Sequence, residues 1–172
     1  VTCLCDVWRV NIPERTIAPA GCMPRRGCDR MIPFLIITYL ARCGEAVPSG
    51  DMIAPRDMIP GNDFFRGEHT LHTHELEARL GAAPDAFAEA CMALGGEPSG
   101  HGDASAVFAI LPKVRVEAIL HAADEEFPAD VRLLIDRNMR HIYPVDATHG
   151  ALALLINRLL HEAPPPPACP AG

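Results

Sequence analysis

Hydrophobic positions along this chain follow two different periods, one typical of strands and one typical of helices. Apolar runs of strand length occupy 104–111, 114–121 and 131–136, and such short runs are typical of buried strands. Three strands of one sheet are the simplest interpretation. Because Pro112 fixes a negative φ between the first two runs, we expect a bend wider than a two-residue hairpin turn there, or an edge position.

Helical periodicity and helix-ending residues occur in four other segments. They predict helices over 29–43, 73–80, 84–94 and 147–161. Asp29 is placed to cap the first helix and Gly44 to end it in the left-handed conformation. Thr73 is placed to cap the second helix. Apolar side chains recur on one face of the last helix, so we expect this helix to pack against the sheet.

The N-terminal region and the long connection after the first helix complete the predicted elements. β-branched and aromatic residues cluster in 1–10 and 16–18 around a turn at 11–15, which predicts an N-terminal β-ribbon. Residues 45–68 are rich in proline and glycine. They predict turns, with one short extended piece near Met52.

Length and composition indicate one domain of α+β class. The chain has 172 residues, of which 49% are apolar, enough to form one core. We expect a single domain over 1–163, in which a small antiparallel or mixed sheet carries the ribbon and about four helices. Four consecutive prolines at 164–167 predict an extended, Pro-rich tail over 164–172.

Charge and hydropathy argue against nucleic acid and membrane as partners. Lysine and arginine total 15 against 22 acidic residues, so the net charge is −7, which opposes attraction to polyanions. The longest apolar run, 31–40, contains Pro33 and is shorter than the roughly 20 residues that span a bilayer. The sequence begins at Val1 without methionine or a signal core. We expect a cytoplasmic protein, or a fragment whose upstream part is missing.

Seven cysteines form an odd set, which argues against a complete disulfide framework and favours a reducing compartment. Cys3, Cys5, Cys22 and Cys28 offer four thiolates to a cluster or zinc ion. On one strand, Cys3 and Cys5 would share a face about 6.6 Å apart. The chain contains no Cys-x-x-Cys pair, so free thiols in a small ribbon are the alternative.

Three histidines and two carboxylates lie within the eight residues 68–75. His69, His72 and His74 are ligands that suit zinc, nickel or iron. No second histidine follows His74 by four residues, so the helical zinc-hydrolase motif is missing. The alternative places His72 and His74 on an exposed loop and helix cap.

Carboxylates gather at the ends of the predicted strands: Asp103, Asp124, Glu125, Glu126 and Asp136. Antiparallel pairing would bring Asp103 close to Asp124, whereas Asp136 need not join them. Such oxygens suit magnesium, calcium or manganese, or divide acid and base roles. In the alternative, Asp103 and Asp136 cap turns, Glu125 and Glu126 face water, and Phe127 anchors the loop in the core.

Six short segments in a specific order carry a family resemblance: 39–42, 59–69, 94–96, 102–104, 111–113 and 124–128 leading to Asp136. Over residues 32–160 the chain resembles the domain-of-unknown-function 3786 family, found mainly in anaerobic bacteria and archaea. The family has no established activity. Its members are often joined or adjacent to a cysteine-rich iron-sulfur segment, so the resemblance implies an iron-sulfur protein or domain as partner. This chain departs from the pattern at His121 and Ala123.

Two functional hypotheses follow. Ser99 lacks the nucleophile setting Gly-x-Ser-x-Gly, and neither phosphate-binding glycine motif occurs. No cofactor is therefore indicated by a motif. We favour a non-catalytic binding or accessory module in anaerobic redox or cofactor metabolism. The alternative is a metal-dependent enzyme that uses His69 with Asp103 and the carboxylates of 124–126.

Overall fold

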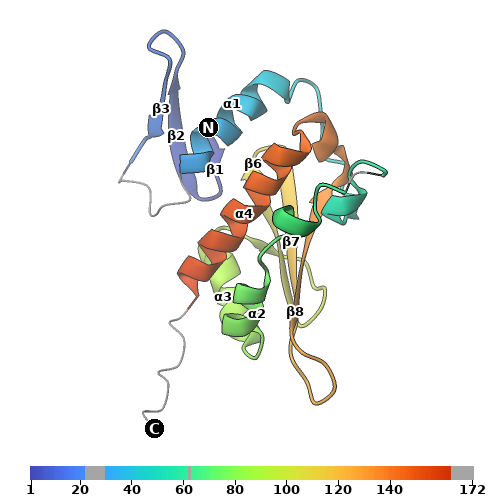
Figure 1. Cartoon of the computed structure of the whole chain (residues 1–172). Helices are drawn as coiled ribbons and strands as arrows, with labels where there is room; N and C mark the ends of the chain where they lie inside the picture. The colour runs from blue at the N-terminus through green and yellow to red at the C-terminus, as the bar shows by residue number, and fades with distance from the viewer. Residues whose placement is uncertain (22–29, 62, 164–172) are drawn as a thin grey trace.

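The structure is a computed structural model that describes residues 1–21, 30–61 and 63–163 (Figure 1). Two antiparallel sheets and four α-helices make up this part of the chain, which confirms the α+β class. Asp29, Cys22, Cys28 and the tail over 164–172 lie outside the described residues.

The larger sheet contains the three predicted strands at its centre. Its strands are β4 (Met52–Ile53), β5 (Glu97–Pro98), β6 (Ala104–Leu111), β7 (Val114–His121) and β8 (Asp130–Asp136). They run in the order β4-β8-β7-β6-β5, and every neighbouring pair is antiparallel. Alternate side chains such as Phe108 and Ile110 are fully buried, because successive residues of a strand point to opposite faces. This alternation builds the core on one face of the sheet.

The connection between β6 and β7 is tighter than the sequence predicted. Leu111 pairs with Val114, so only Pro112 and Lys113 lie between the strands. The expectation of a wider bend or an edge position was therefore wrong. A register shift between Ala109 and Leu111 alters the local twist before the turn, which is how a bulge accommodates an unusual turn geometry.

Four helices cover the core face of the larger sheet. They are α1 (Ile32–Arg42), α2 (His74–Leu80), α3 (Pro84–Ala93) and α4 (Val145–Glu162), with short 3₁₀ turns η2 (Pro55–Asp57), η3 (Gly67–His69) and η4 (Arg137–His141). Figure 1 shows α4 crossing this face, with α1 near one end and α2 and α3 near the other. Within the described residues, no helix has the length and apolar character needed to cross a membrane.

Helix ends follow the predictions only in part. Gly44 has a φ of +33° after α1, as expected for a left-handed stop. Thr73 stands at the N-cap of α2, but its side chain makes no capping hydrogen bond. Its backbone is helical, with φ −70° and ψ −21°, whereas a capping side chain needs an extended backbone. The predicted capping by Thr73 was wrong.

The N-terminal ribbon has three strands where two were predicted. They are β1 (Thr2–Cys3), β2 (Asp6–Asn11) and β3 (Thr16–Pro19), in the order β1-β2-β3. Leu4 has a φ of +51° and reverses the chain, so that Cys3 pairs with Asp6. Cys3 and Cys5 therefore do not share a strand face: Cys3 is buried and Cys5 is exposed.

Candidate functional site

Asp103 joins the loop before β6 to the end of β7 by two hydrogen bonds. Its backbone N–H donates to the Leu120 carbonyl at 2.9 Å, and its Oδ2 accepts from the Ala122 N–H at 2.8 Å. The preceding Gly102 has a φ of +58°, and a Cβ there would lie 2.6 Å from the Leu120 oxygen. Only glycine fits this close approach without a shift. Asp103 thus holds a turn, as one of the two interpretations predicted.

Asp124 organises the acidic loop between β7 and β8. Its Oδ1 accepts hydrogen bonds from the N–H groups of Glu126 at 2.8 Å and Phe127 at 2.7 Å. The hydrogen bonds from Phe127 and then Glu126 lower the pKa of Asp124, because they favour its charged form. The side chains of Glu125 and Glu126 are exposed.

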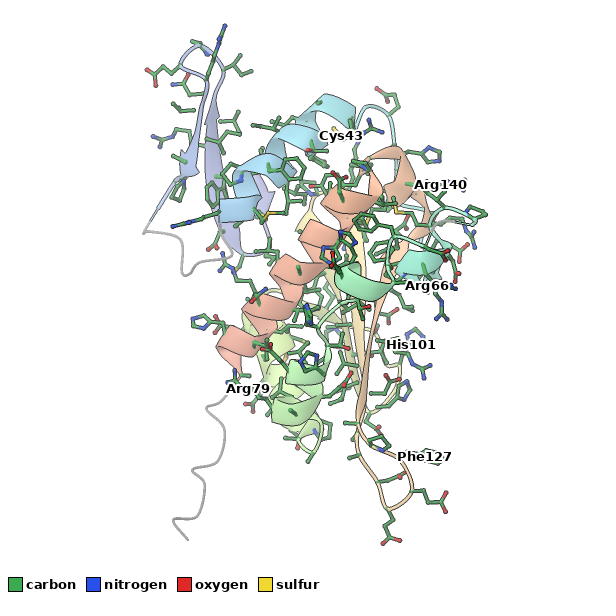
Figure 2. All side chains as sticks on the ribbon, in the orientation of Figure 1. Cys43, Arg66, Arg79, His101, Phe127 and Arg140 are labelled. Atoms are coloured by element: carbon green, nitrogen blue, oxygen red, sulfur yellow. The ribbon has the colours of Figure 1, made fainter. Side chains whose placement is uncertain are left out.

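Phe127 does not anchor this loop in the core. Its exposed fraction is 66%, and Figure 2 shows it beside the β7–β8 connection, away from the helices. The expected anchoring was therefore wrong. Backbone groups of the loop bond to the Asp124 carboxylate, so the turn is held by a local Asx-type arrangement and needs no buried aromatic side chain.

Asp103 and Asp124 line one open cavity of about 610 Å³. His121, Asp130 and Arg132 lie around the same cavity. The structure therefore brings Asp103 and Asp124 to one place, as antiparallel pairing predicted. In the described parts of the chain, however, no group of three or more histidine, cysteine or acidic side chains is arranged to hold a metal ion.

Asp136 lies apart from these two carboxylates. It lines a separate cavity of about 420 Å³ with Ser49 and Arg115. Its carboxylate accepts hydrogen bonds from the Ser49 hydroxyl, the Gly50 N–H and the Asn138 N–H at 3.0, 2.7 and 2.8 Å. Burial alone would raise its pKa, but these hydrogen bonds outweigh burial and lower the pKa. Asp136 ties the loop before β4 to the end of β8.

His69 joins an aromatic cluster on α4. Its ring stacks on Phe64 with 4.2 Å between centroids and meets His149 edge-on at 5.8 Å. Burial, followed by the charges of His69 and His72, lowers the pKa of His149. Figure 2 places Arg66, which directly precedes η3, well apart from Phe127. His69 and the acidic loop thus occupy different parts of the molecule.

His72 and His74 form a second ring pair. Their centroids lie 5.6 Å apart in an edge-on arrangement, and both side chains are exposed. His74 begins α2. This agrees with the interpretation of an exposed loop and helix start.

Sequence reasoning missed His149, because it lies 80 residues beyond His69 and only the packing of η3 against α4 reveals it.

His101 and Glu117 form a close side-chain contact that sequence reasoning also missed. His101 Nδ1 lies 2.6 Å from Glu117 Oε1, and the Glu117 side chain is only 2% exposed whereas that of His101 is 65% exposed. Figure 2 shows His101 on the same side of the view as Phe127. A single carboxylate within the apolar run of β7 was the available signal, because such a group requires a partner when buried.

Among the described cysteines, Cys3 and Cys91 are buried and Cys43 is partly buried. Burial raises the pKa of the Cys91 thiol to about 12. A thiol in that state is a poor source of the thiolate that binds metals and clusters.

A further cavity, also about 610 Å³, follows the outer edge of β8. Its lining is Ala54, Pro55, Arg56, Phe65, Thr70, Leu71, Thr73 and the five consecutive residues 130–134; we call it the β8 groove. Consecutive strand residues point to opposite faces, so all five can line one cavity only at the strand edge. Sequence reasoning missed this groove, since its position depends on where β4 ends.

The fold and these sites define an α+β protein in which Asp103, Asp124 and Asp136 hold turns at the ends of the strands of the larger sheet. A family model described as "Domain of unknown function (DUF3786)" matches residues 9–158. The chain belongs to this family. The match begins within β2, earlier than the residue 32 expected from the resemblance. No curated protein and no solved structure matches the chain.

Proposed function

We propose that this chain is a non-catalytic binding or accessory module of anaerobic redox or cofactor metabolism, and that it binds a partner protein in the β8 groove. One observation carries the proposal. Along the groove, β8 has no neighbouring strand among the described residues, and this edge lies beside apolar side chains, including Phe65 and Leu71. Exposed strand edges bind other chains readily because their backbone groups still lack strand partners.

The arrangement of the acidic residues supports binding over catalysis. The carboxylates of Asp103, Asp124 and Asp136 all accept backbone N–H groups. These hydrogen bonds account for the acidic residues as turn-holding groups. His69, which the alternative hypothesis combines with them, packs against Phe64 and His149 instead.

The proposed partner is an iron-sulfur protein or domain. The family resemblance is the ground for this choice, since its members are often joined or adjacent to a cysteine-rich iron-sulfur segment. Cys3 and Cys91 are buried, and in this proposal the partner supplies the cluster and this chain supplies a docking surface.

Site-specific crosslinking tests the proposal. A photo-crosslinking benzoylphenylalanine replaces Thr70, an exposed residue of the groove, and in a control replaces Thr16, an exposed residue of β3. The experiment uses anaerobic cells of a natural host. We expect one protein to be crosslinked from position 70 and not from position 16, and we expect that protein to contain iron.

One groove variant and one control variant test the crosslink further. Leu71→Glu places a charge in the groove, and Leu40→Glu places the same charge on the exposed face of α1. The first should abolish the crosslink and the second should preserve it. Equal crosslinking from positions 70 and 16, or a crosslink that survives Leu71→Glu, would contradict the proposed binding surface. An iron-free partner would contradict the redox assignment.

A further inference from the structure

The β8 groove continues the line of β4 along the sheet. Met52 pairs with Asp136 and Ile53 pairs with Ile135, so a longer antiparallel strand would place its next residue opposite Leu134. The chain instead turns into η2 at Pro55. Among the described residues, no strand pairs with β8 on this side beyond Ile135. The groove therefore follows a length of strand edge that has a neighbour on one side only.

Backbone groups of β8 point into this groove. The Val131 N–H donates to Glu77 Oε1 at 3.2 Å, so it is directed away from β7 and toward the outer edge. In an antiparallel strand, every second residue directs its N–H and C=O to the same side. The backbone groups of Leu133 thus point outward as well. The Glu77 carboxylate accepts from β8 much as the carbonyl of an added strand would.

The walls of the groove differ in chemistry. Phe65 and Leu71 pack against the hydrophobic core and offer apolar contacts. Arg132 donates to the Asp130 carboxylate at 2.6 Å, so these two charges compensate each other. Arg56 is exposed, and none of the described residues forms an ion pair with it. Arg56 thus offers one positive charge to a ligand of the groove, while the Glu77 carboxylate lies at the Val131 end of the groove.

These features select one kind of occupant. We infer that the β8 groove binds an extended segment of the partner protein as an added strand, and that this segment alternates apolar and acidic residues. The inference rests on the proposed function and names the chemistry of its partner. Backbone hydrogen bonds to Leu133 would hold the strand, apolar side chains would contact Leu71 and Phe65, and carboxylates would pair with Arg56.

A designed peptide tests this inference directly. The probe is an acetylated and amidated heptapeptide of alternating valine and glutamate, labelled for fluorescence anisotropy. We expect saturable binding to the whole chain and shifts of the Val131 to Leu134 backbone amides in NMR spectra. N-methylation of alternate peptide amides removes backbone donors, and lysine in place of glutamate reverses the charge. Each change should weaken binding by at least about tenfold.

Groove variants and matched control variants identify the side chains that contribute to peptide binding. Arg56→Glu should weaken peptide binding by about tenfold or more, whereas Arg9→Glu, at an exposed position of β2, should leave it unchanged. Leu71→Glu and Leu40→Glu form the corresponding apolar pair. Urea denaturation of all four variants verifies that they are folded. Absence of saturable binding, or equal binding of the N-methylated peptide, would overturn the inference.

The remaining outcomes separate the inference from the proposed function. If Leu71→Glu abolishes the cellular crosslink but the peptide does not bind, the occupant is not an extended strand and the proposed function stands. If the peptide binds as expected but position 70 yields no specific crosslink, the groove does bind an extended strand of this chemistry, whereas the proposed function fails. Concentration-dependent self-association that Arg56→Glu abolishes would assign the groove to a second copy of this chain and overturn the inference.

Discussion

Arg158 of α4 donates a hydrogen bond to the carboxylate of Asp6 on β2 at 2.7 Å. The Arg158 side chain is only 2% exposed, and that of Asp6 is 30% exposed. This ion pair joins the N-terminal ribbon to the last helix across 152 residues of sequence. Because removing one partner of a buried ion pair leaves the other charge uncompensated, the contact is one of the attachments of the ribbon.

Replacing Asp6 should loosen this attachment. We expect Asp6→Ala to lower the free energy of unfolding by about 2 kcal/mol, as is common when a charged group loses a hydrogen-bond partner. Urea denaturation measures the effect. The control is Asp57→Ala at an exposed position of η2, where the expected change is within about 0.5 kcal/mol. Equal losses in the two variants would show that the Asp6 contact contributes nothing.

Gly102 offers a second test, of the turn that positions Asp103. Gly102 and Gly100 both have positive φ values, +58° and +77°, but a Cβ at Gly102 would clash with the Leu120 oxygen whereas one at Gly100 would meet nothing within 4 Å. Gly100→Ala should cost about 1 kcal/mol of stability through backbone strain alone. Gly102→Ala should cost at least about 1 kcal/mol more. Thermal and urea unfolding compare them; identical costs would contradict the steric argument.

Much of the larger sheet could be predicted from local pattern. The apolar runs that became β6, β7 and β8 were identified with nearly their observed bounds, because buried strands require uninterrupted apolar residues. The three-stranded ribbon could not be predicted in the same way. Its extra reversal depends on the left-handed backbone of Leu4, and leucine gives no sequence signal for that conformation.

The candidate sites likewise differ in whether local sequence pattern or tertiary packing determines them. Proximity of Asp103 and Asp124 followed from antiparallel strand order alone. The contact between His69 and His149 requires knowledge of how η3 packs against α4, and the β8 groove requires knowledge of where β4 turns away. Phe127 shows the opposite error. Its large apolar side chain predicted a place in the core, whereas the side chain is exposed and the Asp124 carboxylate holds the turn.

His149 makes the stability of the fold depend on pH. Its pKa is lowered by burial and by the charges of His69 and His72, so the folded state favours the neutral ring. The stability contribution is therefore fully present above the unfolded pKa of about 6.5. It decreases as the pH falls through that value and is lost below the lowered folded pKa.

His149→Phe should remove this part of the pH dependence and keep the ring contacts with Phe64. Free energies of unfolding at pH 8 and pH 5 should differ less in this variant than in the wild type. His121→Phe, at an exposed position, serves as the control and should retain the wild-type difference. If His149→Phe retains that difference, protonation of His149 does not contribute to it.

Metal analysis of anaerobically purified protein separates the proposed binding module from the metal-dependent enzyme. In the binding module, Asp103 and Asp124 hold turns through bonds to backbone N–H groups. The joint replacement Asp103→Asn and Asp124→Asn removes both charges but keeps an acceptor oxygen at each position, so it should lower stability only by weakening these hydrogen bonds and should leave the metal content unchanged. Elemental analysis and urea denaturation of the same samples measure both quantities. Stoichiometric metal in the wild type that disappears in the double variant, with folding retained, would favour the enzyme and contradict the turn-holding role as the whole explanation of these carboxylates.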